Sequence, residues 1–144
     1  MVRIVVDSYA WVELFMGSEK GRLVKEKLSS ADEVYTPDIV LAELARKYFR
    51  ERIEANILEA RLSKISELSR IVPVDEKVAV KAAEIDRELK EKARKAGIRE
   101  PGLFDAVIMA VAKVLNASLI TGDEHFKERP ETIWIGGGEG ASAL

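Results

Sequence analysis

The sequence predicts an α/β domain built on a central parallel sheet. Short runs rich in β-branched residues alternate with amphipathic segments along almost the whole chain, and this alternation is typical of parallel strands joined by right-handed helical crossovers. The length of 144 residues is enough for one hydrophobic core. We therefore expect a single domain over residues 1–136, followed by a flexible Gly-rich tail at 137–144.

In the N-terminal half we expect two strands and four helices. The first run, Val2–Val6, is almost continuously apolar, as a strand covered on both faces should be. In order, the expected elements are a strand over 2–6, a helix ended by residues 17–18, a helix over 18–30, a strand from 33 to 37, and helices over 39–52 and 55–68. Ser8, Ser18 and Asp38 are expected to cap the first three of these helices.

The C-terminal half continues the alternation. Its expected elements are a strand from 70 closed by Asp75, an amphipathic helix over 76–96 ended by Gly97, an apolar helix over 103–116, and strands over 118–121 and 132–135. The helix over 103–116 is apolar almost all round, so we expect it to be buried. Four aromatic side chains fall at helical core spacing and are expected to pack inward, namely Trp11, Phe15, Tyr48 and Phe49.

The composition excludes several kinds of function. The formal net charge is −2, so no global basic field favours non-specific coating of nucleic acid. Cysteine is absent, which excludes disulfides, thiolate metal sites and cysteine nucleophiles. We expect a cytoplasmic protein, because no stretch has the pattern of a signal peptide or a membrane span. Glutamine is absent while Glu and Lys are abundant, a bias expected of a thermophile.

Three aspartates lack an obvious structural role. Asp7 and Asp123 follow two of the expected strands, and α/β sheets bind ligands at the edge formed by the carboxyl ends of their strands. Asp105 lies in the first turn of the buried helix, where the helix dipole alone could also explain it. The remaining aspartates have structural explanations, Asp32 in a loop, Asp38 and Asp75 as caps, and Asp86 on the charged side of a helix.

Glu43 stands among mostly apolar neighbours in "IVLAELARKY", and two interpretations of it are open. One is a surface ion pair with Lys47, four residues further on. The other is a carboxylate in a mostly buried helix, which should be paired or bound to a metal. Together with the three aspartates it would form a repelling cluster unless a cation neutralised it. Mg²⁺ or Mn²⁺ suits oxygen ligands and can activate water against a phosphodiester.

The four acidic segments resemble the four motifs of the PIN domain, a metal-dependent ribonuclease fold, and in particular the VapC-type toxins of VapBC toxin–antitoxin pairs. The resemblance rests on Asp7-Ser8 after the first strand, Glu43 in "LAELARK", Asp105 in "LFDAVIMAVAK" and Asp123 in "TGDEHF", in this order along the chain. It implies a three-layer α/β/α sandwich around a parallel sheet. One departure is the loop "KAGIREPGLF", in which Pro101 and Gly102 precede the third motif.

The resemblance also assigns residues and partners. It implies that the catalytic and metal-binding residues are Asp7, Glu43, Asp105 and Asp123. Ser8 and Thr121 match hydroxyl positions that support the acids, a helix cap and a plain β-former being the alternatives. The implied cofactor is Mg²⁺ or Mn²⁺, and the implied partners are an RNA substrate, a small VapB-like antitoxin and a second copy of the chain.

Basic side chains follow the second motif. Arg46, Lys47 and Arg50 could contact RNA phosphates, although a solvated helix face is the alternative. His125, two residues past Asp123, is expected to be structural or solvent-facing and receives no role. The apolar-rich helices between Ile39 and Leu68 offer more nonpolar face than one small core needs, which favours a homodimer.

Three other functions compete with the ribonuclease as interpretations of the sequence. A phosphotransferase of the haloacid dehalogenase type needs a second aspartate two residues after the first, and Tyr9 stands there. A response-regulator receiver needs adjacent acids after the first strand, and Ser8 follows Asp7. A PIN-like domain that acts in RNA maturation, or binds RNA or protein without cutting, stays open. An incomplete acidic set would favour the non-cutting form.

Overall fold

The structure, a computed structural model, describes residues 1–137 and contains a five-stranded sheet in which every paired strand is parallel. The expected tail falls outside the described residues from position 138 onward. The strand order is β3-β2-β1-β4-β5. The strands are β1 (Arg3–Val6), β2 (Glu33–Pro37), β3 (Arg70–Val72), β4 (Ser118–Thr121) and β5 (Thr132–Trp134). β1 and β4 are therefore central neighbours, although they are far apart in the sequence.

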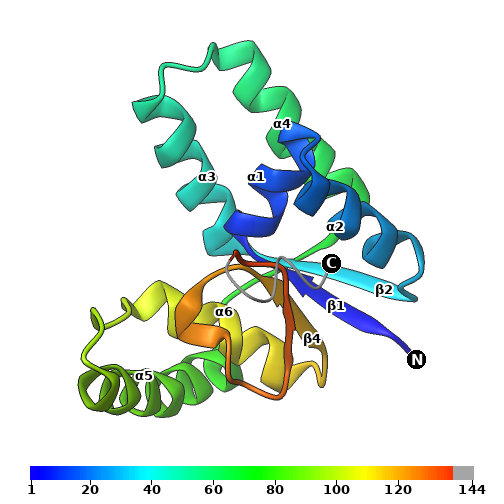
Figure 1. Cartoon of the computed structure of the whole chain (residues 1–144). Coiled ribbons are helices and arrows are strands. Elements are labelled where there is room, and N and C mark those ends of the chain that lie inside the picture. Colours follow the sequence, from blue (N-terminus) through cyan, green and yellow to red (C-terminus); the bar gives the residue numbers. More distant parts are fainter. Residues whose placement is uncertain (138–144) are drawn as a thin grey trace.

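Helices cover both faces of this sheet, as Figure 1 shows. Helices α1 (Ser8–Met16), α2 (Glu19–Ser29), α3 (Asp38–Arg50) and α4 (Ala55–Leu68) lie on one side. Helices α5 (Glu76–Ala96) and α6 (Leu103–Val114) lie on the other, and a short 3₁₀ turn, η1 (Glu124–Phe126), follows β4. The expected three-layer α/β/α sandwich is confirmed, with the crossovers placed as a parallel sheet requires.

The core forms where the sequence is most continuously apolar. Ile4, Val5 and Val6 of β1 are buried, as a strand covered by helices on both faces must be. Every residue of α6 from Ala106 to Ala112 is also buried, so this helix lies between the sheet and α5. Trp11 is fully buried, and its indole Nε1 donates to Thr36 Oγ1 at 3.1 Å. This bond satisfies the polar atom of the largest core side chain.

Two of the expected helix caps are wrong. Asp7, not Ser8, is the N-cap of α1, because the backbone at Asp7 is still extended and its carboxylate accepts from Ala10 N. Pro37, not Asp38, occupies the N-cap position of α3, and Asp38 lies inside the first turn, where the helix dipole favours an acid. The caps expected at Ser18 and Asp75 are confirmed by bonds to the backbone N–H groups of Gly21 and Val78.

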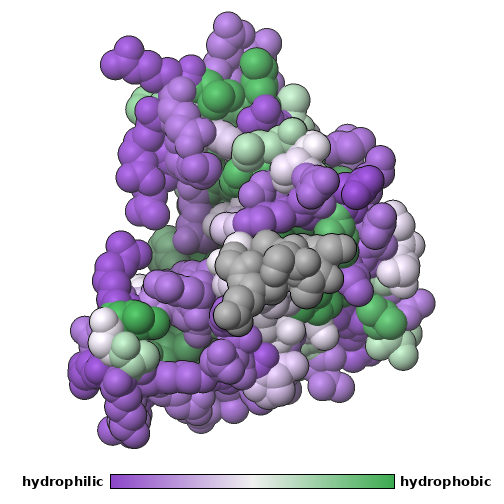
Figure 2. Space-filling view, in the orientation of Figure 1, coloured by the Kyte–Doolittle hydropathy of each residue, from purple (hydrophilic) through white to green (hydrophobic). Residues whose placement is uncertain are grey.

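Of the two adjacent aromatic residues in α3, Tyr48 is buried and Phe49 is exposed. Tyr48 is buried as expected, but the expectation for Phe49 is wrong, since this side chain is 80% exposed. Consecutive helical residues point about 100° apart, so the two rings cannot face one core. Helices α3 and α4 project from the sheet as a hairpin (Figure 1) that also exposes Ile57 and Leu68. Figure 2 shows hydrophobic residues on this upper lobe within a largely hydrophilic surface.

Within residues 1–137, none of the helices combines the length and the apolar character that crossing a membrane would require.

Candidate active site

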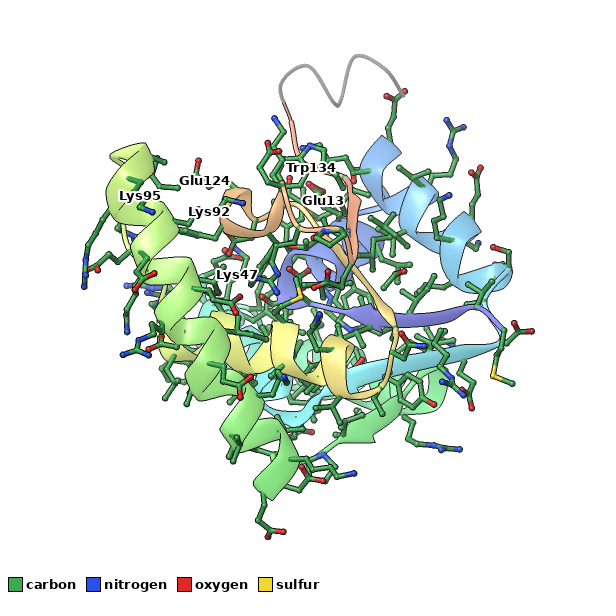
Figure 3. The ribbon with its side chains drawn as sticks, turned by 90° about the horizontal axis from the view of Figure 1, so that it is seen from below. Glu13, Lys47, Lys92, Lys95, Glu124 and Trp134 are labelled. Atoms are coloured by element: carbon green, nitrogen blue, oxygen red, sulfur yellow. The ribbon has the colours of Figure 1, made fainter. Side chains whose placement is uncertain are left out.

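A pocket of about 450 Å³ lies at the carboxyl ends of β1 and β4, and it brings the four predicted acids together. β1 delivers Asp7 and the segment after β4 delivers Asp123, while α3 and α6 supply Glu43 and Asp105. The full lining is Asp7, Ser8, Tyr9, Val12, Glu13, Glu43, Lys47, Asp105, Ile108 and Asp123. Figure 3 labels two of these side chains from different helices, Glu13 of α1 and Lys47 of α3. In Figure 2 the surface is hollowed between the lobe of α3 and the lobe of α5.

Backbone N–H groups hold one oxygen of each aspartate in the pocket. Asp7 Oδ1 accepts from Ala10 N at 2.9 Å and Asp105 Oδ2 accepts from Gly102 N at 3.1 Å. Asp123 Oδ1 accepts from the backbone N of His125 at 2.9 Å. Each bond belongs to the start of a helical segment, so local helix-capping chemistry orients the carboxylates. One oxygen of each side chain is thereby fixed, and the second is left for other partners.

Asp7 is the most deeply buried acid, with 3% of its surface exposed. Burial raises its pKa to about 7, against hydrogen bonds from Thr121 and Ala10 that lower it, and the charges of Asp123 and Glu43 raise it further. In the protein without a cation, this carboxyl is therefore about half protonated near neutral pH. A positive charge in the pocket would lower the pKa of Asp7 and favour its ionised form.

The structure decides between the two interpretations of Glu43, which are a surface ion pair with Lys47 and a buried carboxylate. Lys47 bonds to Glu51 at 2.7 Å and not to Glu43, so the Glu43–Lys47 ion pair is absent from the described part of the chain. Glu43 Oε1 is instead buried and has no hydrogen-bond partner among residues 1–137. Burial, followed by the charge of Asp105, raises the pKa of Glu43 to about 7, although Arg46 acts in the opposite direction.

Asp105 stands in the first turn of α6, at the position where the sequence places it. Burial and then the charge of Asp123 raise the pKa of its carboxyl, while the Gly102 hydrogen bond and the charges of His125 and Arg99 oppose this rise. The unusual loop before α6 therefore still delivers Asp105 to the pocket. Its Gly102 supplies the N–H group that orients the carboxylate.

The supporting hydroxyl groups occupy two different positions. Thr121 is fully buried at the end of β4, and its Oγ1 accepts from Asp123 N at 3.0 Å. The same side chain is a hydrogen-bond partner of Asp7, so Thr121 connects two of the acids. Ser8 lines the pocket but does not cap α1.

The three basic residues of α3 are not equivalent. Lys47 lines the pocket, and Arg46 lies close enough for its charge to lower the pKa of Glu43. Arg50, at the end of α3, is exposed and does not line the pocket. A phosphate group bound in the pocket would therefore meet Lys47 first.

His125, to which the sequence assigned no role, contacts one of the acids of the pocket. Its Nδ1 lies 2.8 Å from Asp123 Oδ1, and its Nε2 lies 2.6 Å from the carbonyl oxygen of Arg99. Burial works to lower its pKa, but the bonds to Arg99 and Asp123 and the charges of Asp123 and Asp105 outweigh burial and raise it. The signal in the sequence was only its spacing from Asp123, because the partner Arg99 is 26 residues away.

Two of the residues that line the pocket, Tyr9 and Glu13, were not predicted from the sequence. Tyr9 packs its ring against Gly122, where an added Cβ would overlap the ring, and its hydroxyl accepts from Lys20 Nζ at 2.8 Å. Glu13 accepts from Ser18 Oγ at 2.9 Å. Tyr9 and Glu13 stand on one face of α1, since residues four apart in a helix share a face. A charged Glu13 within an apolar helix was the available signal.

The donor set fits a hard divalent cation. Several carboxylates line the pocket, and carboxylates are ligands that Mg²⁺ and Mn²⁺ prefer. Asp105, Asp123 and His125 offer candidate ligand atoms within 4.8 Å of one another. The orphaned Glu43 Oε1 and the raised pKa values of Asp7, Glu43 and Asp105 are what a site built around positive charge should show without its cation.

Comparison with protein families identifies one match. The model of the PIN domain matches residues 4–131, a range that contains the four acids of the pocket. No curated protein matches the chain.

Several solved structures share the fold. VapBC2 from Rickettsia felis, solved with a DNA fragment from the promoter, has a TM-score of 0.70 at 21% identity, covering 92% of this chain and 97% of that chain. FitAcB from Neisseria gonorrhoeae has a TM-score of 0.56 at 27% identity, covering 83% and 87%. VapC20 from Mycobacterium tuberculosis, described as a sarcin-ricin loop cleaving toxin, has a TM-score of 0.57 at 20% identity, covering 97% and 94%.

Replacing Asp7 by Asn should stabilise the metal-free protein in a pH-dependent way. Folding raises the pKa of Asp7 from 3.8 to about 7, so its contribution to stability is fully present below about pH 4 and is lost as the pH rises to about 7. Asn keeps the acceptor for Ala10 N but cannot ionise. Urea unfolding in chelator should show nearly equal stabilities at pH 4 and a gain of about 1–3 kcal/mol for the variant at pH 8. A difference that does not change with pH would contradict this account.

Proposed function

The chain belongs to the PIN domain family, and we propose that it is a Mg²⁺- or Mn²⁺-dependent ribonuclease that hydrolyses RNA phosphodiester bonds. The observation that carries the proposal is the convergence of four carboxylates, from four separate parts of the chain, in one pocket with an unpartnered buried Glu43 oxygen. Structural acids seldom accumulate in this way, because their mutual repulsion and burial destabilise the fold.

In this proposal Asp7, Glu43, Asp105 and Asp123 hold the cation or orient the attacking water. A divalent cation bound there would supply Lewis acidity and a water molecule of lowered pKa. The backbone bonds to the three aspartates keep one oxygen of each in place, so little reorganisation is needed when the cation binds. Thr121 keeps Asp7 and Asp123 in a fixed relation, and Ser8 adds a hydroxyl to the pocket wall.

Lys47 is proposed to bind the RNA backbone at the pocket, and Arg46 and Arg50 to extend this contact along α3. Lys47 is the basic side chain among the lining residues, and its ion pair with Glu51 is about half exposed. An exposed pair of this kind contributes little stability, so exchanging Glu51 for a phosphate group would cost little. Since the protein as a whole carries a net charge of −2, RNA would bind through this local group rather than through a general field.

The biological setting proposed is that of a VapC-type toxin restrained by a small VapB-like antitoxin. Support comes from the family match and from fold neighbours that include a Klebsiella pneumoniae toxin–antitoxin complex, VapBC2 and FitAcB. A homodimer, a cytoplasmic location and a thermophilic source belong to the same proposal. Roles in RNA maturation or in binding without cleavage are the alternatives that the experiments below separate from it.

Replacing Asp105 by Asn should abolish metal-dependent cleavage of RNA. Asn retains an acceptor for Gly102 N, so the start of α6 is preserved while the charge is removed. We expect the rate on end-labelled RNA with Mg²⁺ or Mn²⁺ to fall by about a hundredfold or more, since metal-assisted charge stabilisation is worth several kcal/mol.

The matched control is Asp75→Asn. Asp75 caps α5 outside the pocket by accepting from Val78 N, and Asn is an equally good cap. This variant should cleave like the wild type, and chelator should stop both. Equal cleavage by the Asp105 and Asp75 variants would refute the nuclease assignment, and cleavage by none of the proteins would favour a non-cutting role.

A small antitoxin should accompany the protein in its native source. We expect affinity purification of the tagged chain from that source to yield a small, stoichiometric partner whose removal increases RNA cleavage. Recovery of the chain alone would contradict the toxin setting while leaving the ribonuclease chemistry intact.

The purified chain should form a dimer through the exposed apolar side chains of the α3–α4 hairpin. Phe49, Ile57 and Leu68 are exposed there in the monomer, which is unfavourable unless another surface covers them. Sedimentation equilibrium should give twice the chain mass of 16.0 kDa, and Phe49→Ser should shift the protein toward monomer. A wild-type monomer at micromolar concentration would refute the dimer.

A further inference from the structure

We propose that His125 is a positioning residue that locks Asp123 and the loop before α6 into the geometry in which the pocket binds its cation. The inference rests on the proposed function, because it concerns the same metal site. It assigns a role to the chain's one histidine, which lies outside the four acidic positions of the pocket.

The imidazole makes one contact with each ring nitrogen. Nδ1 bonds to Asp123 Oδ1 at 2.8 Å, and Nε2 bonds to the carbonyl oxygen of Arg99 at 2.6 Å. The side chain is only 7% exposed, so the bond to Asp123 is partly shielded from water, while the bond to the Arg99 carbonyl lies at the surface. Asp123 Oδ1 also accepts from the backbone N of His125 at 2.9 Å. Two contacts from one residue therefore fix this oxygen and with it the rotamer of the carboxylate.

His125 is placed to orient a ligand rather than to be one. The ring nitrogens lie near the carboxylate oxygens of Asp105 and Asp123. The carbonyl oxygen of Arg99 can only accept a hydrogen bond, however, so Nε2 carries a proton and donates it to that bond. Nδ1 is occupied by Asp123. Both nitrogens therefore face oxygen atoms of the protein rather than an open coordination position. A donor that fixes a metal-binding carboxylate from behind is a common feature of metal sites, and its loss usually weakens metal binding by about 10- to 100-fold.

The second contact, from His125 to Arg99, also restrains Asp105. We call the two contacts of the imidazole, to Asp123 and to Arg99, the His125 clamp. Arg99 belongs to residues 97–102, the loop that leads into α6, and Gly102 at its end donates to Asp105 Oδ2. Across residues 1–137, the bond from His125 to Arg99 is the hydrogen bond that ties this loop to η1. A continuous path therefore runs from Asp123 through His125, Arg99 and Gly102 to Asp105.

This path restrains two groups that repel each other. The charge of Asp123 raises the pKa of Asp105, so the two carboxylates would move apart if the loop and the Asp123 side chain were free. Holding them together before the cation arrives reduces what the cation must reorganise. Loss of the imidazole should therefore lower metal affinity and turnover without removing any ligand.

Three variants separate the two halves of the clamp. His125→Asn retains a donor near the position of Nδ1, toward Asp123, and His125→Gln can carry a donor toward the Arg99 carbonyl. His125→Ala removes both. The control is Glu124→Gln, an exposed neighbour in η1 that makes no side-chain hydrogen bond among the described residues.

The first measurement is Mn²⁺ affinity by titration calorimetry on the purified full chain, which does not depend on RNA cleavage. We expect His125→Ala to raise the Kd for Mn²⁺ by about 10- to 100-fold, with His125→Asn and His125→Gln between Ala and wild type. Glu124→Gln should match the wild type. Added imidazole should restore affinity to His125→Ala, because the residue borders a small cavity of about 110 Å³ shared with α5.

The second measurement is steady-state cleavage of RNA at saturating metal. We expect kcat to fall in His125→Ala while KM for RNA changes little, since His125 neither lines the pocket nor contacts Lys47. A purely structural role would lower the melting temperature and leave the Mn²⁺ Kd of the folded variant unchanged. That result, or a wild type that does not bind Mn²⁺, would overturn the proposal. Mn²⁺ binding weakened by His125→Ala in a protein that cleaves no RNA would support the clamp and refute the ribonuclease.

Discussion

The structure depends on holding like charges together at one edge of a parallel sheet. The carboxyl ends of β1 and β4 lie side by side, and the residues that follow them bring Asp7 and Asp123 into the same pocket. Backbone N–H groups bind one oxygen of each aspartate and so offset part of the repulsion. The same bonds begin α1, α6 and η1. Helix initiation and assembly of the acidic site are therefore one set of interactions.

Glu43 lacks the kind of backbone hydrogen bond that orients the three aspartates of the pocket. It lies in the middle of α3, where no free backbone N–H is available to bind its side chain, and in the described part of the chain its buried Oε1 has no partner. The fold tolerates the free-energy cost of burying this oxygen because neighbouring residues of α3, Val40, Leu44 and Tyr48, are buried in the core. Sites that break local rules in a well-packed element are where function is expected. A cation in the pocket would supply what the backbone cannot.

Much of this arrangement could be predicted because its signals are local. Asp75 and Gly97 mark the two ends of α5, and the structure places both as caps. The apolar run of α6 predicted a buried helix and isolated Asp105 as the exception. The predictions that were wrong or missing share a cause. Each concerns a feature that depends on backbone direction or on a partner far away in the sequence. Asp7 replaces Ser8 as the cap because α1 already begins at Ser8, directly after the extended backbone of Asp7, and Arg99, the partner of His125, lies in another segment.

The glycine of "TGD" shows how two distant motifs constrain each other. A Cβ at Gly122 would overlap the ring of Tyr9, which follows Asp7-Ser8 at the start of α1. Tyr9 can therefore lie against the backbone between Thr121 and Asp123 only because no side chain stands there. This contact brings the first turn of α1 against the end of β4, and Thr121 bonds across the same junction. The sequence pattern Asp-Ser-Tyr and the pattern Thr-Gly-Asp are thus two sides of one packed junction, and the spacing of the acids follows from that packing.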